Sequence, residues 1–206
     1  MRFIGINGGT FDPIHYGHLR AALEVQYKLQ LEQVRFIPCY QPVHRDSPMV
    51  SSEQRAAMIE LAIQGQPLFY LDRIEIERGG PSYMVDTLAA LKEQQADVGL
   101  VLMMGTDAFS KFHTWHNWQQ ILKLANIAVM HRPGDGLTLY SESGQILSAH
   151  QVAKFTQPSE QIMDVVITQL DLSSTAVRSH LQNEIPVDYL LPPQVINYIK
   201  THRLYQ

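Results

Sequence analysis

GGTFDPIHYGHL, residues 8–19, is the stretch that points most directly to a fold, because it reads as a turn between a strand and a helix. Residues 3–6 before it are apolar and predict a buried strand, whereas residues 17–29 after it have the apolar spacing of a helix. Gly8 and Gly9 fall at the turn, where positive φ and the missing Cβ let main-chain N–H groups approach an anion closely. The stretch therefore predicts a phosphate-binding turn.

Two histidines stand at the start of the helix that follows this turn. The free N–H groups and the dipole of a helix N-terminus favour an anion by roughly 0.3–1 kcal/mol at an exposed site. His15 and His18 are three residues apart, a spacing that brings both side chains to one side of a helical turn. Their donors can stabilise the spread charge of a phosphoryl transition state without a protein nucleophile. In isolation, such a pair also fits a structural role in capping and packing; the glycines and Thr10 beside it favour the functional role.

Composition excludes several classes of protein. The 206 residues include 16 basic and 20 acidic side chains, a formal net charge of -4, which argues against an extended nucleic-acid footprint. Cys39 is the single cysteine, so neither an internal disulfide nor a cysteine-based zinc site is expected. No stretch approaches the ~20 apolar residues of a membrane span, and no export segment is indicated. We expect a soluble cytoplasmic protein without nucleic-acid or membrane partners.

Apolar runs alternate with helical patterns along the chain. Strands are predicted at 3–6, 34–37, 98–104, 126–130 and 164–168, and helices at 17–29, 52–64, 83–95, 107–124 and 175–182. This alternation predicts an α/β fold: a doubly wound parallel sheet with helices on both faces, whose ligands gather at the carboxyl ends of the strands. Ser51 and Gln54 predict a capping box, and Pro192 and Pro193 the start of a terminal helix. Residues 134–148 are rich in Gly, Ser and Thr and predict a surface loop.

Residues 172–178, LSSTAVR, form a second candidate anion site. Ser174 and Thr175 fall where a predicted helix begins and its first N–H groups are free, and Arg178 follows about one turn later. A guanidinium can hold phosphate oxygens in a bidentate pair, so the helix start and Arg178 can share one polyphosphate. Taken alone, the Ser-Ser-Thr run also reads as a plain helix cap.

The stretch at residues 8–19 resembles the nucleotidyltransferases that carry an H-x-G-H signature, and it looks like their bacterial nicotinate-nucleotide adenylyltransferase branch. Residues 172–178 are similar to the I-S-S-T-x-x-R motif of that family, with Leu172 in place of isoleucine, and residues 188–205 resemble its C-terminal helix. The resemblance implies a Rossmann-like fold of nucleotidyltransferase type in one domain, residues 1–206. A small C-terminal helical portion, about residues 173–206, would pack on it. Class I aminoacyl-tRNA synthetases share the histidine pair but are usually much longer.

The resemblance places an ATP site around the turn. The implied ATP-binding residues are Gly8, Gly9, Thr10, Phe11, His15, His18, Gly105, Asp107, Arg132, Ser174, Thr175 and Arg178. His15 and His18 would act on the transferring phosphoryl group, with help from Thr10. Gly105 and Asp107 would meet the adenosine ribose, although Asp107 also reads as a helix cap.

The resemblance also implies a mononucleotide site from three segments, residues 38–45, 81–88 and 112–118. The implied residues are His44, Arg45, Ser82, Tyr83, Met84, Trp115 and His116. His44 and Arg45 would engage the 5′-phosphate, although a basic pair on a proline-rich loop is also typical of solvated surface.

The pyridine ring would stack on Trp115, whereas Trp118 is expected in the core. Met84 stands where the family has threonine, and His116 where it often has another aromatic residue. If a main-chain N–H holds the nicotinate carboxylate, the change at Met84 is tolerable; if a hydroxyl is needed, the preference for nicotinate is altered. The choice between acid and amide therefore stays open.

The implied activity is transfer of AMP from ATP to nicotinate mononucleotide, giving deamido-NAD and pyrophosphate in NAD biosynthesis. Mg²⁺ is expected to arrive with the ATP phosphates, and a metal site built on His15, His18, His113 and His116 is the alternative.

A sister enzyme acting on nicotinamide mononucleotide or phosphopantetheine is the nearest alternative function. A noncatalytic dinucleotide-binding sensor or a dehydrogenase is more distant, because the first turn lacks G-x-G-x-x-G. We expect a monomer or a homodimer.

Overall fold

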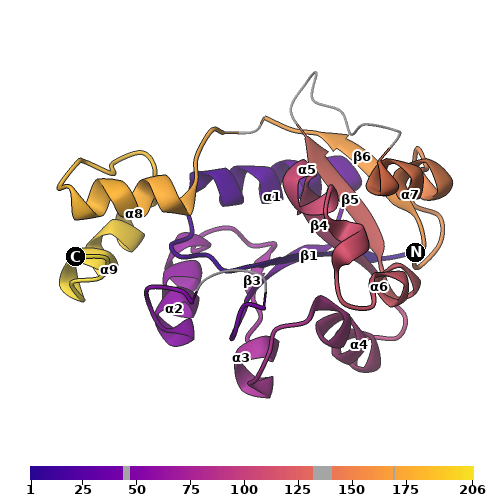
Figure 1. The fold of residues 1–206 in the computed structure, drawn as a ribbon, viewed down its shortest axis with the longest axis horizontal. Helices are drawn as coiled ribbons and strands as arrows, with labels where there is room; N and C mark the ends of the chain where they lie inside the picture. Colours follow the sequence, from indigo (N-terminus) through magenta and orange to yellow (C-terminus); the bar gives the residue numbers. More distant parts are fainter. Residues whose placement is uncertain (44–46, 132–140, 169) are drawn as a thin grey trace.

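A computed structural model describes residues 1–43, 47–131, 141–168 and 170–206, in which a parallel sheet lies among helices (Figure 1). The strands are β1 (Phe3–Gly9), β2 (Gln33–Pro38), β3 (Phe69–Leu71), β4 (Gly99–Gly105), β5 (Asn126–His131) and β6 (Ile162–Val166). The sheet order is β3-β2-β1-β4-β5-β6, and every neighbouring pair is parallel. This is a doubly wound order that reverses between β1 and β4, so the predicted fold class is confirmed.

The helices fill the connections between the strands. They are α1 (Tyr16–Leu29), α2 (Ser52–Ala62), α3 (Ile74–Arg78), α4 (Met84–Gln94), α5 (Thr106–Phe109), the short 3-10 helix η1 (Phe112–Thr114), α6 (Trp118–Leu124), α7 (Glu142–His150), α8 (Ser174–Gln182) and α9 (Pro193–Thr201). The capping box is confirmed at the start of α2, where the Gln54 N–H donates to Ser51 Oγ (3.2 Å) and the Ser51 N–H to Gln54 Oε1 (3.0 Å). None of these described helices has the length and apolar character needed to cross a bilayer.

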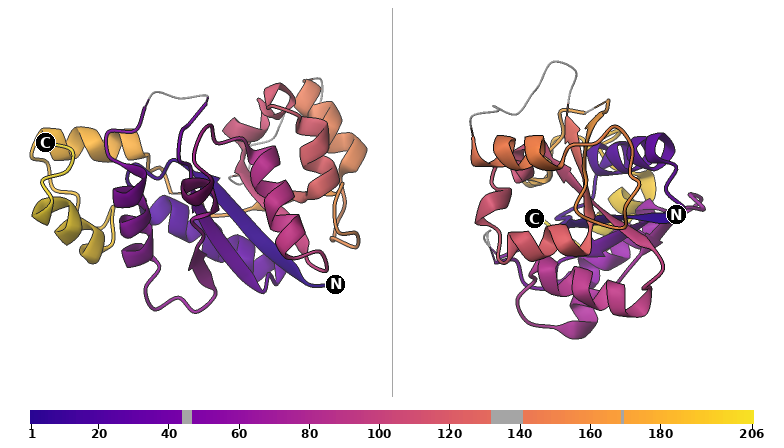
Figure 2. Two further views of the ribbon diagram at one scale, coloured as in Figure 1. Left: turned by 90° about the horizontal axis from the view of Figure 1, so that it is seen from below. Right: turned by 90° about the vertical axis from the view of Figure 1, so that its right-hand side faces the viewer.

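Alternate residues of the strands point into two separate cores. In β4, Val101 and Met103 face a first core covered by α1 and α2, while Leu100, Leu102 and Met104 face a second core covered by α4 and α6. Figure 2 shows the sheet between these helical layers. Because both faces are covered, the central strands are rich in apolar residues, and β4 is apolar throughout, which is why their positions can be recognised in the sequence.

The C-terminal helices α8 and α9 join the first core. Val177, Val195 and Ile199 are buried in it, and α9 packs against α2. A core shared with the sheet supports our proposal that residues 173–206 pack on a single domain.

The single helix expected at 107–124 is wrong. The chain forms α5, η1 and α6 there, with an extended residue at Trp115 and a left-handed one at Asn117 (φ 52°). Residues 112–117 are aromatic, β-branched, His or Asn, all weak helix formers, and Asn tolerates the left-handed conformation. The break leaves Trp115 and His116 on an irregular segment instead of a helix face.

The sequence pattern does not predict β3, α3 or α7. β3 is only three residues long, and α7 lies largely in the Gly- and Ser-rich region expected as a loop. Ser141 caps α7, since its hydroxyl accepts the Gly144 N–H over 3.0 Å. The strand expected at 164–168 is β6, which starts two residues earlier. Residues 132–140 lie outside the described residues.

Candidate active site

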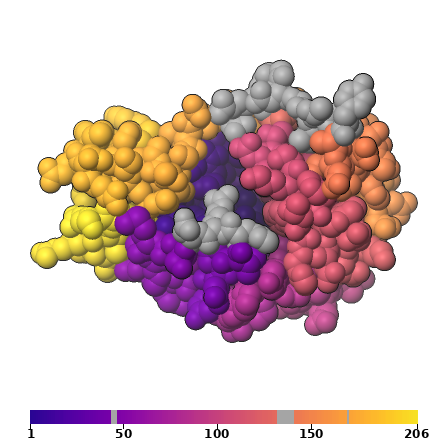
Figure 3. All heavy atoms as spheres, in the orientation of Figure 1, coloured from indigo at the N-terminus to yellow at the C-terminus, as the bar shows by residue number. Residues whose placement is uncertain are grey.

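The turn after β1 lies where the order of the sheet reverses. β1 ends at Gly9 and β4 ends at Gly105, so both carboxyl ends lie at the same edge of the parallel sheet. Figure 3 shows a hollow on this face, with N-terminal residues on its floor and with α8 and α5 on opposite sides. Ligands of doubly wound sheets bind at such a switch point.

The two glycines at the end of β1 supply space. The positive φ expected for Gly8 and Gly9 is wrong, because both residues continue the strand. A Cβ on Gly8 would lie 2.5 Å from Cε of Met84, so the Met84 side chain rests against the end of β1. The residue with positive φ in this turn is Phe11, at 52°.

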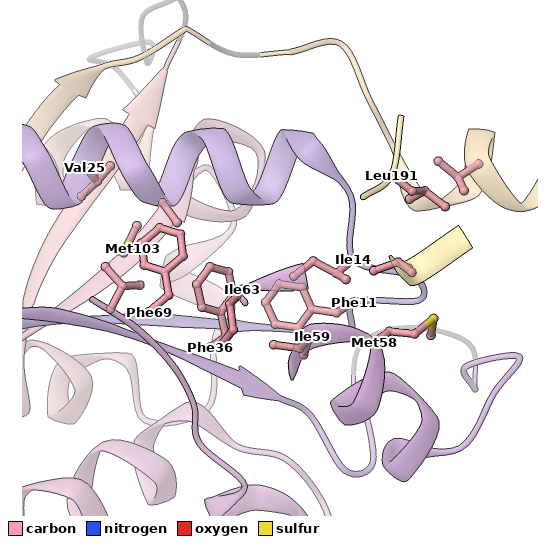
Figure 4. Close-up of a cluster of buried hydrophobic side chains, with 14 of the residues drawn as sticks. Phe11, Ile14, Val25, Phe36, Met58, Ile59, Ile63, Phe69, Met103 and Leu191 are labelled. Carbon is pink, nitrogen blue, oxygen red and sulfur yellow. The ribbon is translucent and has the colours of Figure 1, made fainter. Parts of the chain in front are cut away.

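Apolar side chains fix one side of the turn. Phe11 and Ile14 point into the first core, where the rings of Phe11 and Phe36 lie 6.0 Å apart (Figure 4). Leu191, from the C-terminal portion, reaches the same cluster. The backbone between Phe11 and Ile14 is therefore anchored to the first core by these side chains.

His15 and His18 are brought together as predicted, with unequal exposure. Their imidazoles stack with ring centroids 3.7 Å apart and an interplanar angle of 23°. His15 is the N-cap residue of α1 and is 4% exposed, whereas His18 is half-buried and meets the edge of Phe11 at 5.0 Å. His18 is therefore the more accessible of the pair.

Burial and one hydrogen bond set the protonation of these rings. The main-chain N–H of His15 donates to Nδ1 of His18 (3.3 Å), so a neutral His18 carries its proton on Nε2. Burial lowers the pKa of His15 to about 4, which keeps that imidazole neutral near pH 7. Its Nδ1 is buried with no hydrogen-bond partner among the described residues. In a neutral His18 the proton therefore lies on Nε2, and the stacked His15 ring beside it is neutral near pH 7.

Side chains from the first half of α8 donate hydrogen bonds to main-chain carbonyls of the histidine turn. Nη1 of Arg178 donates to the Asp12 carbonyl (2.7 Å), and the Ser174 hydroxyl donates to the Pro13 carbonyl (2.9 Å). Nη2 of Arg178 also donates to Oγ1 of Thr175 (3.3 Å). The segment predicted to grip phosphates therefore lies beside the histidine turn, and part of its donor capacity holds that turn.

Arg55 of α2 belongs to the candidate site, although the sequence does not predict this. Arg55 is 1% exposed, and its guanidinium donates to the carbonyls of Thr10 (2.7 Å) and Cys39 (2.6 Å). Thr10 belongs to the histidine turn, and Cys39 lies in the segment expected to bind the mononucleotide. Burial raises the pKa of the nearby Glu75 carboxyl, and the positive charge of Arg55 opposes that rise. One buried cation therefore ties together the two halves of the candidate site.

At the end of β4, the two residues expected to meet ribose are accessible. A Cβ on Gly105 would meet no heavy atom of the described residues within 4 Å, and Asp107 is exposed in the first turn of α5. Met103 and Met104 are buried, as expected for core residues.

All three predicted acceptor segments meet in space. The Ser82 hydroxyl accepts the N–H groups of Tyr40 (2.9 Å) and Gln41 (3.3 Å), which joins it to the segment after β2. The rings of Tyr83 and His116 lie 4.6 Å apart, at an interplanar angle of 41°. These contacts bring Ser82, Tyr83 and His116 to one region.

Both tryptophans pack beside Phe112. Its ring centroid lies 6.0 Å from that of Trp115 and 5.8 Å from that of Trp118. Both are half-buried against the second core, so the expected contrast between an accessible Trp115 and a core Trp118 is weaker than predicted. His44, Arg45 and Arg132 lie outside the described residues.

Two further features of the described residues bear on where the site lies. In the described part of the chain, no three His, Cys, Asp or Glu side chains are grouped so that they could hold a metal ion. Two surface depressions of about 590 and 560 Å³ lie at the opposite edge of the sheet, around the end of α1 and the starts of the strands. Neither depression includes a residue of the motifs above. The candidate active site is therefore assigned from the functional side chains that meet at the turn after β1.

Comparisons with known proteins agree on one family. A model described as cytidylyltransferase-like matches residues 6–180. A curated relative from Hydrogenovibrio crunogenus, described as a probable nicotinate-nucleotide adenylyltransferase, is 60% identical over 205 residues, 100% of this chain and 98% of the relative. A Methylococcus capsulatus relative with the same description is 42% identical over 98% of this chain and 99% of its own. The solved Plasmodium falciparum nicotinic acid mononucleotide adenylyltransferase complexed with NaAD has a similar fold, with a TM-score of 0.78 at 19% identity, over 100% of this chain and 98% of that chain.

Proposed function

The chain belongs to the cytidylyltransferase-like family, within its nicotinate-nucleotide adenylyltransferase branch, and on this premise we propose that it transfers AMP from ATP to nicotinate mononucleotide. The products are deamido-NAD and pyrophosphate. The observation that carries this proposal is the stacked pair of His15 and His18 at the N-terminus of α1, beside the point where the sheet order reverses.

The reaction needs positioning and charge neutralisation more than covalent chemistry. A phosphate oxygen of the mononucleotide bonds to the α-phosphorus of ATP, and the bond from that phosphorus to the bridging β-phosphate oxygen breaks. The electron pair leaves with pyrophosphate. Nε2–H of His18 and the N-terminal N–H groups of α1 would stabilise charge on the α-phosphoryl oxygens, with Thr10 assisting.

The start of α8 is proposed to hold the departing pyrophosphate. The main-chain N–H groups of Ser174 and Thr175 have no acceptor among the described residues, and Arg178 lies one turn later. Mg²⁺ would come with the ATP phosphates and supply further charge neutralisation. The other ATP-binding residues inferred from the resemblance stay predictions.

Recognition of the pyridine acid would rest on main-chain groups. Met84 begins α4 and has no hydroxyl, so its N–H, together with that of His116, is the proposed donor to the nicotinate carboxylate. Trp115 would stack on the ring, and His44 and Arg45 would bind the 5′-phosphate. The free thiol of Cys39 fits our proposal of a cytoplasmic location.

Pyrophosphate release tests the proposed function. With ATP and Mg²⁺, we expect kcat/KM for nicotinate mononucleotide to exceed that for nicotinamide mononucleotide and for phosphopantetheine by roughly tenfold or more, since only the acid offers a carboxylate to paired donors. A coupled pyrophosphate assay across the three acceptors measures this. A higher value for another acceptor would assign the chain to a sister activity, and binding of ATP and acceptor without release would favour a sensor.

Gly17 provides room for the His15 imidazole and is the subject of a separate prediction. A Cβ there would lie 2.9 Å from Nδ1 and 3.0 Å from Cε1 of His15. Gly17→Ala should displace the ring and lower kcat by roughly tenfold or more. The thermal midpoint should change little, because the better helix propensity of alanine, about 1 kcal/mol, offsets the cost of moving the ring. Steady-state kinetics and thermal unfolding check both; wild-type kcat in this variant would contradict the prediction.

A further inference from the structure

Tyr205 is distant in sequence from the histidine turn and touches it in space. Its hydroxyl donates to Oδ1 of Asp12 over 2.8 Å, and both residues are 4% exposed. We propose that Tyr205 is a positioning residue for adenylyl transfer, holding Asp12 and thereby the turn that leads to His15 and His18. This inference rests on the function proposed above.

The Asp12 carboxylate is the point at which separate elements meet. Oδ2 accepts the main-chain N–H of Met49 (2.9 Å), from the segment before α2, and lies 3.8 Å from Nη1 of Arg178. Tyr205 is the donor to the other oxygen, Oδ1. Removing the Tyr205 hydroxyl would therefore leave one carboxylate oxygen inside the protein without its donor, and Asp12 would have to move to regain one.

The surroundings of Tyr205 keep its hydroxyl protonated, so that it can donate to Asp12. Burial, followed by the negative charge of Asp12, raises the pKa of Tyr205, so the proton stays on the phenol. Leu204 beside it is 7% exposed, and Arg203 and Tyr205 have φ values of 51° and 65°. A segment with two non-glycine residues in the left-handed region keeps that shape only where packing enforces it.

The C-terminal portion makes a second contact with the same turn. The Leu190 carbonyl accepts the N–H of Tyr16, the first residue of α1, over 3.0 Å. His15, which precedes it, is thus set between the Asp12 contact and the Leu190 contact. Only two residues separate Asp12 from His15, so a shift of Asp12 would displace His15 and misplace the imidazole stack.

Tyr205→Phe removes the hydroxyl and leaves the ring packing in place. We expect kcat to fall roughly tenfold to a hundredfold, the cost typical of a misplaced reacting geometry, with KM for the mononucleotide within about twofold of wild type. In the part of the chain that the structure describes, no hydrogen bond or ring contact joins Tyr205 to the acceptor segments, so KM for the mononucleotide should change little. The matched control is Tyr198→Phe, the same chemical change in α9, where the ring lies against His202 at 4.2 Å. That control should keep wild-type kcat.

Amide hydrogen exchange gives a readout that does not depend on turnover. Exchange across residues 11–18 should become faster in Tyr205→Phe and stay unchanged in Tyr198→Phe. A wild-type kcat in Tyr205→Phe, unchanged exchange at the turn, or a kcat that recovers fully at a lower assay temperature would each overturn the positioning role. Absence of pyrophosphate release by the wild-type protein would refute the proposed function instead, so the two failures are distinguishable.

Discussion

His18→Ala is expected to lower kcat by roughly 10²–10³, the usual cost of removing one donor aimed at developing negative charge. Nε2–H of His18 is the proposed donor, because its Nδ1 already accepts the His15 N–H. The fold should persist: His18 is only half-buried, and alanine is a good helix former. Pyrophosphate release measures the loss, and circular dichroism with thermal unfolding measures the fold.

Two variants sharpen this experiment. His18→Gln places an amide N–H near the position of imidazole Nε2 and should retain more activity than alanine. His202→Ala removes an exposed imidazole beside Tyr198, outside the site, and should turn over like wild type. Turnover of His18→Ala within a few-fold of wild type would refute the proposed role of the pair.

Arg55→Met is expected to lower the free energy of unfolding by about 3–5 kcal/mol, the range seen when one member of a buried charged network is removed. The variant leaves the Thr10 and Cys39 carbonyls without their donor and removes the positive charge near the buried carboxyl of Glu75. Urea unfolding with an unchanged m-value measures the loss.

Arg73→Met is the matched control for this change. Arg73 donates to Glu53 over 2.7 Å, but the two side chains are 38% and 62% exposed, so the pair should contribute about 0–1 kcal/mol. Equal losses in the two variants would contradict the role assigned to Arg55.

Local patterns predict most of the architecture. Covered parallel strands are rich in apolar residues, and helix starts carry recognisable caps. Five of the six described strands, and the helices α1, α2, α4 and α8, are therefore predicted within a few residues of their observed bounds. The break at Trp115 and Asn117 depends on local backbone geometry that weak helix propensities only hint at. The three-residue β3 exists because it pairs with β2, which a local window does not detect.

The candidate site likewise contains residues that the sequence predicts and residues that it does not. The histidine pair and the Ser-Ser-Thr segment are short motifs with a mechanism, and the fold does bring them together. Arg55 and Tyr205 carry no local signal, because their roles come from carbonyl and carboxylate groups supplied by distant residues. The positive φ expected at Gly8 and Gly9 is wrong because the need there is for space beside Met84.

The hydrogen bonds from Ser174, Arg178 and Tyr205 to the turn span 161, 166 and 193 positions along the chain. Contacts between residues so far apart in sequence form late in folding, because the entropy cost of closing a long loop precedes the favourable energy of the contact. During translation the N-terminal strands emerge first, so a nascent chain stalled before α8 should assemble sheet without a finished nucleotide pocket. Ribosome-bound intermediates are therefore expected to bind no ATP until α8 and the segment around Tyr205 have left the exit tunnel.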